Sequence, residues 1–238
     1  MGSEDRFSLF ATLSSVIVAL AAVLYAWLDP AGFQGHLAKD GRGSGIIEHL
    51  TVIILMPGIL AGIRTFLLRA RFPHRLTAYW VLAWTAACIY FAGEEASWGQ
   101  WYFNWETPEF VRSINDQGET NLHNTTSWLD QKPRTLVELF ILASVFAAPL
   151  LRVTGCAKRL QESDFFSFVM TWILAPGCLL PAGLLYVMVK ASGFLSGGIF
   201  DSIGNGELRE FIIAWFLTLY LISYHVRLSG SAADRTKG

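Results

Sequence analysis

Charged residues are scarce in this chain of 238 residues, in which Asp, Glu, Lys and Arg together make up 16%. The formal net charge is -1 and no run of basic residues occurs, so no nucleic-acid partner is expected. The three cysteines, Cys88, Cys156 and Cys178, form no CxxC pair, which argues against a disulfide framework or a cysteine metal site. P-loop, GxSxG and HExxH motifs are also missing. The common signatures of nucleotide binding, serine hydrolysis and zinc proteolysis are therefore absent.

Long apolar blocks dominate what is present. The hydrophobic share is 53% and the mean hydropathy is +0.41, and blocks of this length are typical of membrane spans rather than of a soluble core. The sequence predicts an all-α polytopic bundle of about six transmembrane helices in a single domain, residues 1–238. The first block ends in Tyr25, Trp27 and Asp29 and is read as a retained span, because a signal peptide has a basic head and a shorter core. The expected spans are 10–28, 46–68, 76–92, 136–151, 165–191 and 208–226.

Two spans carry features that predict local geometry. In the second span, Pro57 is followed by Gly58 and Gly62 in a GxxxG pattern, which is either a site of close helix packing or ordinary apolar sequence. In the fifth span, Pro176 and Pro181 predict a break or a strong kink.

The placement of basic residues predicts the orientation. Eleven of the 18 Lys and Arg residues lie in four segments: the residues before the first span, the 64–75 link, the 152–159 link and the residues after the last span. The positive-inside rule then places both termini in the cytoplasm. The partly helical segment 93–135 between the third and fourth spans falls on the opposite side, which is the periplasm in a bacterium.

Carboxylates cluster at the outer end of two spans. Glu94 lies about 27 Å along a helix from Leu76, and Glu48 lies about 31 Å from Arg69, so both should sit at the same rim. Carboxylates at that depth are costly unless they face a polar interior or a cation. We therefore expect Glu48 and one of the pair Glu94/Glu95 to point into a shared cavity. Adjacent helical residues diverge by about 100°, so Glu94 and Glu95 should have different roles.

The linker that follows is rich in polar side chains. Thr107 as a cap and Pro108 in the first turn predict a short helix. That helix would place Asn115, Glu119 and His123 on one face. Gln117, Asn121 and Asn124 would lie on the neighbouring face, unless Gly118 turns the chain.

Three interpretations of these residues remain open. Glu119 and His123, joined by Glu95 or Glu48, could hold a divalent metal such as Zn, Fe or Mn. Without a metal, Glu95, Glu119 and His123 could act as catalytic acid and base groups. Alternatively, the polar residues could form a structural hydrogen-bond knot. The candidate substrate-binding residues are Trp98, Gln100, Gln117, Asn121 and Asn124, and Trp98 also suits an interfacial anchor.

The motifs of this region and of the second span carry a resemblance to a known group of proteins. They are GEExSWGQ at 93–100 and NxQGExNLHN at 115–124, preceded by Asp40-Gly41 and Glu48-x-Leu50-Thr51. They resemble the pattern of a group of bacterial inner-membrane proteins with no assigned activity. The resemblance implies a bacterial, multi-pass inner-membrane protein. A fainter likeness is to alkaline ceramidase-type membrane hydrolases, whose paired histidines near the last span this chain lacks.

Three functional classes follow. The first is a membrane hydrolase or transferase that acts on a lipid or lipid-linked substrate at the periplasmic rim. The second is a non-catalytic subunit or assembly factor with membrane-protein partners. The third is a transporter or receptor for a cation or small solute, against which the absence of a visible inverted repeat counts.

Overall fold

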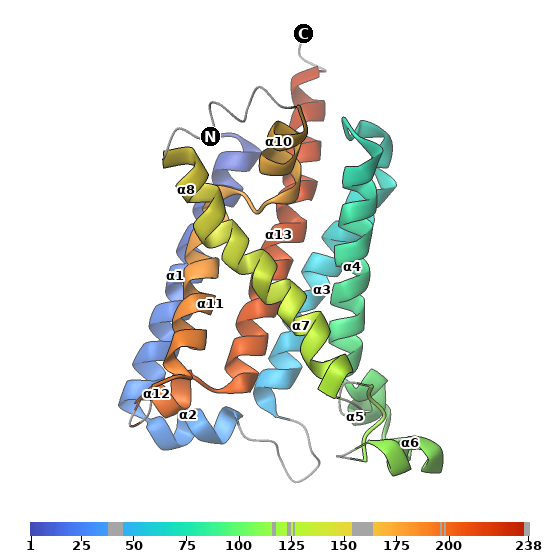
Figure 1. Cartoon of the computed structure of the whole chain (residues 1–238), viewed down its shortest axis with the longest axis vertical. Helices are drawn as coiled ribbons and strands as arrows, with labels where there is room; N and C mark the ends of the chain where they lie inside the picture. Colours follow the sequence, from blue (N-terminus) through green and yellow to red (C-terminus); the bar gives the residue numbers. More distant parts are fainter. Residues whose placement is uncertain are drawn as a thin grey trace.

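The computed structural model describes residues 1–37, 45–115, 118–122, 125, 127–153, 164–195, 197 and 199–235. Within these ranges every regular element is a helix, and the long helices run roughly along one common direction (Figure 1). The predicted all-α class is therefore confirmed.

Five helices are long and apolar enough to cross a membrane, and a bent pair raises the number to six. The five lie at Ser3–Leu28, Ile46–Leu67, Arg75–Glu95, Lys132–Leu151 and Gly206–Gly230. The bent pair is Asp164–Ile173 with Gly177–Ser192, at an angle of 43°. Each segment overlaps one of the expected spans, and the chain is accordingly a multi-pass membrane protein.

The elements occur in the following order. The helices that form the spans are α1 (Ser3–Leu28), α3 (Ile46–Leu67), α4 (Arg75–Glu95), α7 (Ser127–Leu142) with η3 (Ala143–Ala147) and α8 (Ala148–Val153), α10 (Asp164–Phe168) with η4 (Val169–Ile173), η5 (Gly177–Leu179) with α11 (Leu180–Ser192), and α13 (Gly206–Arg235). The short connecting elements are α2 (Pro30–Leu37), η1 (Arg69–Arg71), η2 (Ser97–Gly99), α5 (Gln100–Phe103), α6 (Glu109–Ile114) and α12 (Ile199–Ile203).

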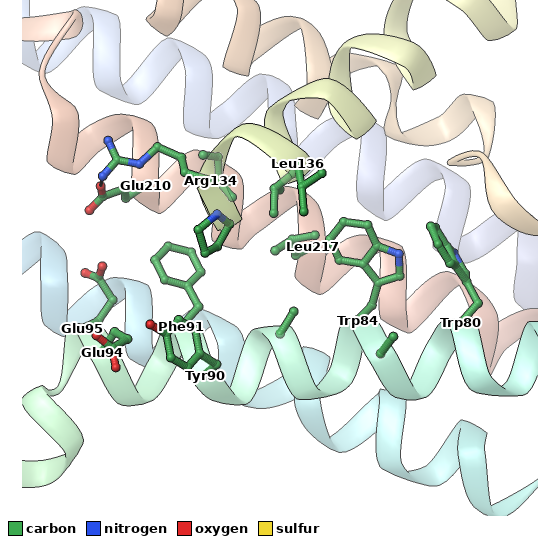
Figure 2. A pocket seen from close by; sticks show the side chains of 15 residues that line it. Trp80, Trp84, Tyr90, Phe91, Glu94, Glu95, Arg134, Leu136, Glu210 and Leu217 are labelled. Atoms are coloured by element: carbon green, nitrogen blue, oxygen red, sulfur yellow. Dashed lines mark ion pairs between the residues drawn. The ribbon is translucent and has the colours of Figure 1, made fainter. Parts of the chain in front are cut away.

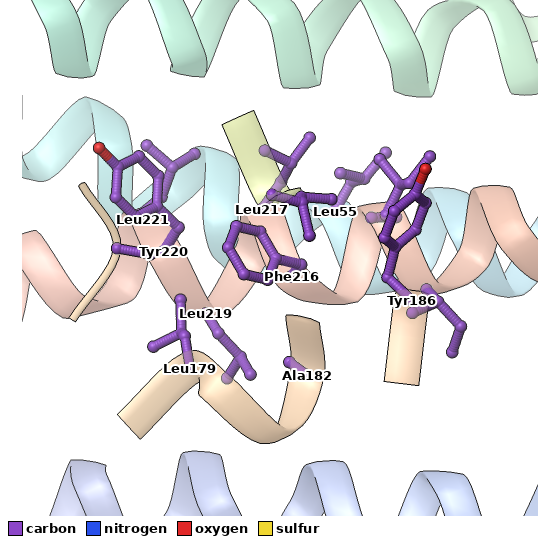
Figure 3. Close-up of a cluster of buried hydrophobic side chains, with 14 of the residues drawn as sticks. Leu55, Leu179, Ala182, Tyr186, Phe216, Leu217, Leu219, Tyr220 and Leu221 are labelled. Atoms are coloured by element: carbon purple, nitrogen blue, oxygen red, sulfur yellow. The ribbon is translucent and has the colours of Figure 1, made fainter. Parts of the chain in front are cut away.

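Helix α13 is the centre of the bundle. It packs against α1, α3, α4 and α11, and 72% of its membrane window is buried, against 11% for α1. Phe216 and Tyr220 of α13 are fully buried, and they pack with Leu55 and Leu179 from neighbouring helices (Figure 3). Leu, Ile and Val side chains on the outer helix faces remain exposed, as a lipid environment requires.

The GxxxG pair is a site of close packing on two sides. A Cβ at Gly58 would come within 2.8 Å of the Thr218 Cα of α13, and a Cβ at Gly62 would come within 2.1 Å of the Thr85 Oγ1 of α4. Thr218 also donates a hydrogen bond of 2.7 Å to the Ile54 carbonyl. The two glycines therefore let α3 approach a different helix at each position.

The predicted break in the fifth span occurs just before Pro176. Leu174 is extended, with φ −71° and ψ 152°, whereas Pro181 lies in the first turn of α11. The break exposes carbonyl groups at the end of η4, and α13 satisfies them. Tyr224 donates to the Trp172 carbonyl and Tyr220 donates to the Ile173 carbonyl. A proline break inside the membrane is thus tolerated because neighbouring side chains replace the lost helical hydrogen bonds.

Candidate functional site

The end of α4 carries two neighbouring carboxylates that point in different directions. Glu94 is buried and accepts hydrogen bonds of 2.7 Å from Trp98 Nε1 and from the Leu122 backbone N–H. Glu95 instead lies beside Glu207 and Glu210 of α13. Figure 2 shows Glu95 extending toward α13 while Glu94 lies below it on α4. The divergence is the one expected of adjacent residues on a helix.

Three carboxylates from two helices form what we call the acidic cluster: Glu95, Glu207 and Glu210. One oxygen from each lies within 4.8 Å of the other two. Glu48 is a further carboxylate near Glu95. Carboxylates this close repel one another when they are ionised, and a proton or a cation among them lowers that repulsion.

One guanidinium lies beside the cluster. Arg134 of α7 pairs with Glu210 at 2.7 Å, and the two side chains are 28% and 17% exposed (Figure 2). The positive charge of Arg134 offsets part of the negative charge of the acidic cluster.

An apolar cavity of about 330 Å³ begins at this polar end and lies between α4, α7 and α13. Its α4 wall includes Trp80, Trp84, Ala87 and Phe91, whose spacing of four, three and four residues keeps them on one helix face. From Glu95 to Trp80 this wall extends about 22 Å along the helix. Figure 2 shows the acidic residues and Arg134 at one end and the tryptophans at the other. Leu136, Val137, Ile213 and Leu217 complete the apolar lining.

A second group of charges, which are partly buried, lies farther along α7. Glu138 forms ion pairs with Lys190 of α11 and, at 3.8 Å, with Arg209 of α13. Each charge thus has a partner of opposite sign, which is the usual arrangement for ionisable groups inside a membrane.

The linker after α4 forms a separate polar knot, defined here as Ser97, Asn115, Glu119 and Asn121. Glu119 Oε2 accepts hydrogen bonds from Ser97 Oγ at 3.0 Å and from Asn121 Nδ2 at 2.7 Å. Asn115 Oδ1 accepts from the Glu119 backbone N–H, and Asn115 Nδ2 donates to Asn121 Oδ1 at 2.8 Å. All four residues are buried. These bonds support the structural-knot interpretation of the polar residues.

The predicted helix face in this linker is wrong. Helix α6 ends at Ile114, Asn115 is extended, and Gly118 turns the chain with φ +68°. Asn115 and Glu119 therefore meet through a turn rather than through helical spacing. Thr107 also makes no capping bond, because Pro108 is the N-cap residue of α6, and the Thr107 hydroxyl accepts from Gln100 Nε2 at 2.9 Å.

A strained turn connects α4 to the knot. Ser97 and Trp98 have φ of +43° and +54°, a region that residues other than glycine rarely adopt. The turn folds the Trp98 ring back over Gly93, where an added Cβ would come within 2.9 Å of the ring. Beyond it, burial raises the pKa of Tyr102 above its ordinary value. Its hydroxyl contacts His49 Nδ1 at 3.2 Å.

The described residues among the predicted site residues do not all meet in one place. Glu95 is in the acidic cluster and Glu119 is in the polar knot, where Asn121 joins it. Glu48 accepts a hydrogen bond of 2.7 Å from the Gly45 backbone N–H at the start of α3. Gln100 accepts from the Thr120 backbone N–H at 2.8 Å, and Trp98 donates to Glu94. His123, Gln117 and Asn124 lie outside the described residues, so the trio Glu95, Glu119 and His123 stays a prediction.

Sequence reasoning missed the partners of Glu95. Glu207 and Glu210 lie in the first turns of the last span and Arg134 lies at the start of the fourth. The i, i+3 spacing of Glu207 and Glu210 was a usable signal, since it places two acids on one face at the end of an apolar helix. Among the described residues, Glu95, Glu207 and Glu210 are the group of acids placed to hold a metal ion.

Comparisons with protein families, curated proteins and solved structures give no match to this chain. The functional argument accordingly depends on the geometry of the cavity and the acidic cluster.

Proposed function

We propose that this protein is a bacterial inner-membrane enzyme, a hydrolase or transferase, that binds a membrane lipid between α4, α7 and α13. The lipid tail would occupy the apolar cavity and the headgroup would lie at the acidic cluster. The observation that carries the proposal is the continuity of the two features: an apolar cavity of about 330 Å³ ends at Glu95, Glu210 and Arg134. An apolar site with a few convergent polar groups at one end is the usual form of a ligand site.

The dimensions of the cavity suit a lipid tail. The α4 wall of about 22 Å compares with about 15 Å for half of the hydrocarbon core of a bilayer. A tail that lies along α4 could therefore extend from the membrane rim to the middle of the bilayer. The headgroup would then be level with the carboxylates, as in a lipid of the adjacent leaflet.

The acidic cluster supplies groups suited to acid and base chemistry. Glu95 and Glu210 offer carboxylate oxygens within 4.8 Å of each other, so one carboxyl group can hold a proton while the other stays ionised. Such a pair can donate a proton to a leaving group and accept one from an attacking hydroxyl. Arg134 holds Glu210 in place through their ion pair.

A divalent metal is a second way to offset the charge of the cluster. The cluster offers only carboxylate oxygens, which suit Mg²⁺ or Mn²⁺ better than Zn²⁺. Glu119 already accepts hydrogen bonds from Ser97 and Asn121 in the polar knot. The acidic cluster is thus the better candidate for a metal than the set predicted from the sequence.

The lipid proposal can be tested by filling the cavity. Ala87 lines it, whereas its neighbour Ala86 is exposed on the same helix. Ala87→Trp should block the tail, and Ala86→Trp, which adds the same bulk to the outer surface, serves as the matched control. Lipid that remains with each protein after purification in mild detergent would be extracted and quantified by mass spectrometry. We expect Ala87→Trp to retain about tenfold less lipid per protein than the wild type, a loss of about 1.4 kcal/mol.

The control should retain the wild-type amount. Equal amounts of lipid with both variants would show that the cavity does not hold the tail. Turnover would then be assayed on the lipid that copurifies, comparing wild type with Glu95→Gln. If wild-type protein leaves that lipid unchanged in the presence of water and an alcohol acceptor, the hydrolase or transferase part of the proposal is wrong.

A further inference from the structure

The linker after α4 has polar side chains inside and apolar side chains outside. The four residues of the polar knot are buried. Large apolar side chains of α5, α6 and the residues between them are instead exposed, and we call the following five the apolar surface of the linker: Tyr102, Phe103, Trp105, Phe110 and Ile114. A loop in water has the opposite distribution. An exposed apolar surface of this kind marks contact with a membrane or with another protein.

Helix α6 is amphipathic and lies across the bundle. Phe110 and Ile114 are separated by four residues, so they share one helix face, and they are 75% and 47% exposed. Glu109, Arg112 and Ser113 occupy the other side and are exposed as well. Figure 1 shows α6 at the end of the bundle, directed across α4 rather than along it. A short amphipathic helix with this direction suits the plane of a membrane surface.

Two aromatic rings extend the same surface at α5. Phe103 is 76% exposed, and its ring stacks on Trp105 with centroids 5.9 Å apart and planes 7° apart. Both rings pack against Gly99, where an added Cβ would come within 3.0 Å of Trp105 and 3.2 Å of Phe103. The pair is therefore held beside the end of α4 while part of each ring stays exposed. Tryptophan and tyrosine are enriched at the level of lipid headgroups.

Hydrogen bonds hold the linker at the level of the membrane rim. Helix α4 has 21 residues, so its length of about 31 Å matches the hydrocarbon core of about 30 Å. The far end of the linker returns to α4, because Glu94 accepts a hydrogen bond of 2.7 Å from the Leu122 N–H. Tyr102 contacts His49 at the beginning of α3, and the exposed Ile46 lies on the same face as His49. The apolar surface of the linker thus continues the lipid-facing surface of α3.

We propose that α5 and α6 form a membrane-surface anchor, in which Phe103, Trp105, Phe110 and Ile114 insert among the lipids of the leaflet next to the acidic cluster. The occupant of the apolar surface is the bilayer itself. Its level at the end of α4 and its continuity with α3 favour lipid over a partner protein. This inference is independent of the lipid site in the cavity, because these four residues do not line that cavity.

Spin labels on single cysteines test the anchor. The full-length chain, with its three native cysteines replaced by alanine, would carry Phe103→Cys or Phe110→Cys and be reconstituted in liposomes. Oxygen concentrates in lipid and a nickel chelate stays in water, so their collision rates with the label report its surroundings. We expect the ratio of the oxygen rate to the nickel rate to be about tenfold higher at these positions than at exposed polar neighbours.

The matched controls are Glu106→Cys and Glu109→Cys, which place the label at exposed polar positions of the same linker. Both should remain accessible to the nickel chelate. Phe103 and Phe110 are mostly exposed, so their replacement removes little packing. Ile114→Cys replaces either variant that does not give a monodisperse protein.

Two results would overturn the anchor. Equal access of the nickel chelate to the apolar and polar positions would place the apolar surface in water. Exclusion of both oxygen and nickel from Phe103→Cys and Phe110→Cys would show that protein covers them, which in liposomes of the purified chain means a second copy. Either result would leave the proposed cavity site intact, since that site is tested by lipid retention in Ala87→Trp.

Discussion

Glu94 and Glu95 are neighbours in the sequence and have unrelated surroundings. Glu94 joins the end of α4 to the linker through Trp98 and the Leu122 backbone. Glu95 faces two acids of α13 across the bundle. The cause is the helical rotation of about 100° per residue. One carboxylate therefore stabilises the linker while the other forms part of the candidate site.

At the scale of single residues, Glu119 tests the polar knot. Glu119→Gln keeps one acceptor oxygen but loses the charge that strengthens the bonds from Ser97 and Asn121. We expect a loss of about 1–3 kcal/mol in stability, measured as a lower midpoint of thermal unfolding in detergent. Lipid binding at the acidic cluster should be unchanged.

The exposed Glu109→Gln serves as the reference for the stability measurement. An unchanged midpoint together with lost turnover would argue that Glu119 acts in catalysis, as the sequence allowed. That result would also favour the predicted catalytic role of His123.

At the scale of elements, two glycines of α3 lie at its contacts with α13 and α4, beside the buried apolar side chain of Leu55. Gly58 lies against the backbone of α13, and Gly62 lies against Thr85 of α4. Close approach of backbones is a common way for helices to associate in lipid, where burying apolar side chains gives little driving force. A methyl group at either glycine should push a neighbouring helix away.

Gly58→Ala tests this packing. Its Cβ would come within 2.8 Å of the Thr218 Cα, a backbone atom that cannot move aside as a side chain can. We expect a loss of about 1–3 kcal/mol in stability, seen as a lower unfolding midpoint. The matched control is Gly35→Ala in α2, where an added Cβ meets no atom within 4 Å. Equal midpoints for the two variants would contradict the close α3–α13 packing.

At the scale of the whole molecule, buried charge is distributed unevenly. The acidic cluster and the ion pairs of Glu138 gather where α4 ends and α7 and α13 begin, on the side of α5 and α6 in Figure 1. The opposite end carries the 64–75 link, which is rich in arginine. We propose that this arginine-rich end faces the cytoplasm and the acidic end faces the periplasm.

Cysteine labelling tests this orientation in intact bacterial cells. Glu106→Cys places a thiol in the exposed linker after α5, and Arg71→Cys places one in the exposed link after α3. A maleimide that cannot cross the inner membrane should label Glu106→Cys in cells whose outer membrane is permeable. It should label Arg71→Cys only after the inner membrane is opened, and the wild-type chain gives the background from native cysteines. The reverse pattern would invert the proposed topology.

The sequence by itself determined the spans and the break in the fifth span. Both depend on local properties, since about 20 apolar residues suffice to cross a bilayer and proline cannot donate a helical hydrogen bond. The different directions of Glu94 and Glu95 also followed from helical geometry alone. For the linker, the sequence left two outcomes open: a continuous helix or a turn at Gly118. The structure has the turn at Gly118.

Only the tertiary structure decided what Glu95 meets. Its partners Glu207 and Glu210 come from the last helix of the bundle and Arg134 from the fourth span, so their proximity depends on how α4, α7 and α13 pack. Hydropathy specifies that each of these helices crosses the membrane, but it does not specify which faces meet. Packing through small residues and buried hydrogen bonds determines which faces meet. The acidic cluster and the cavity follow from that packing.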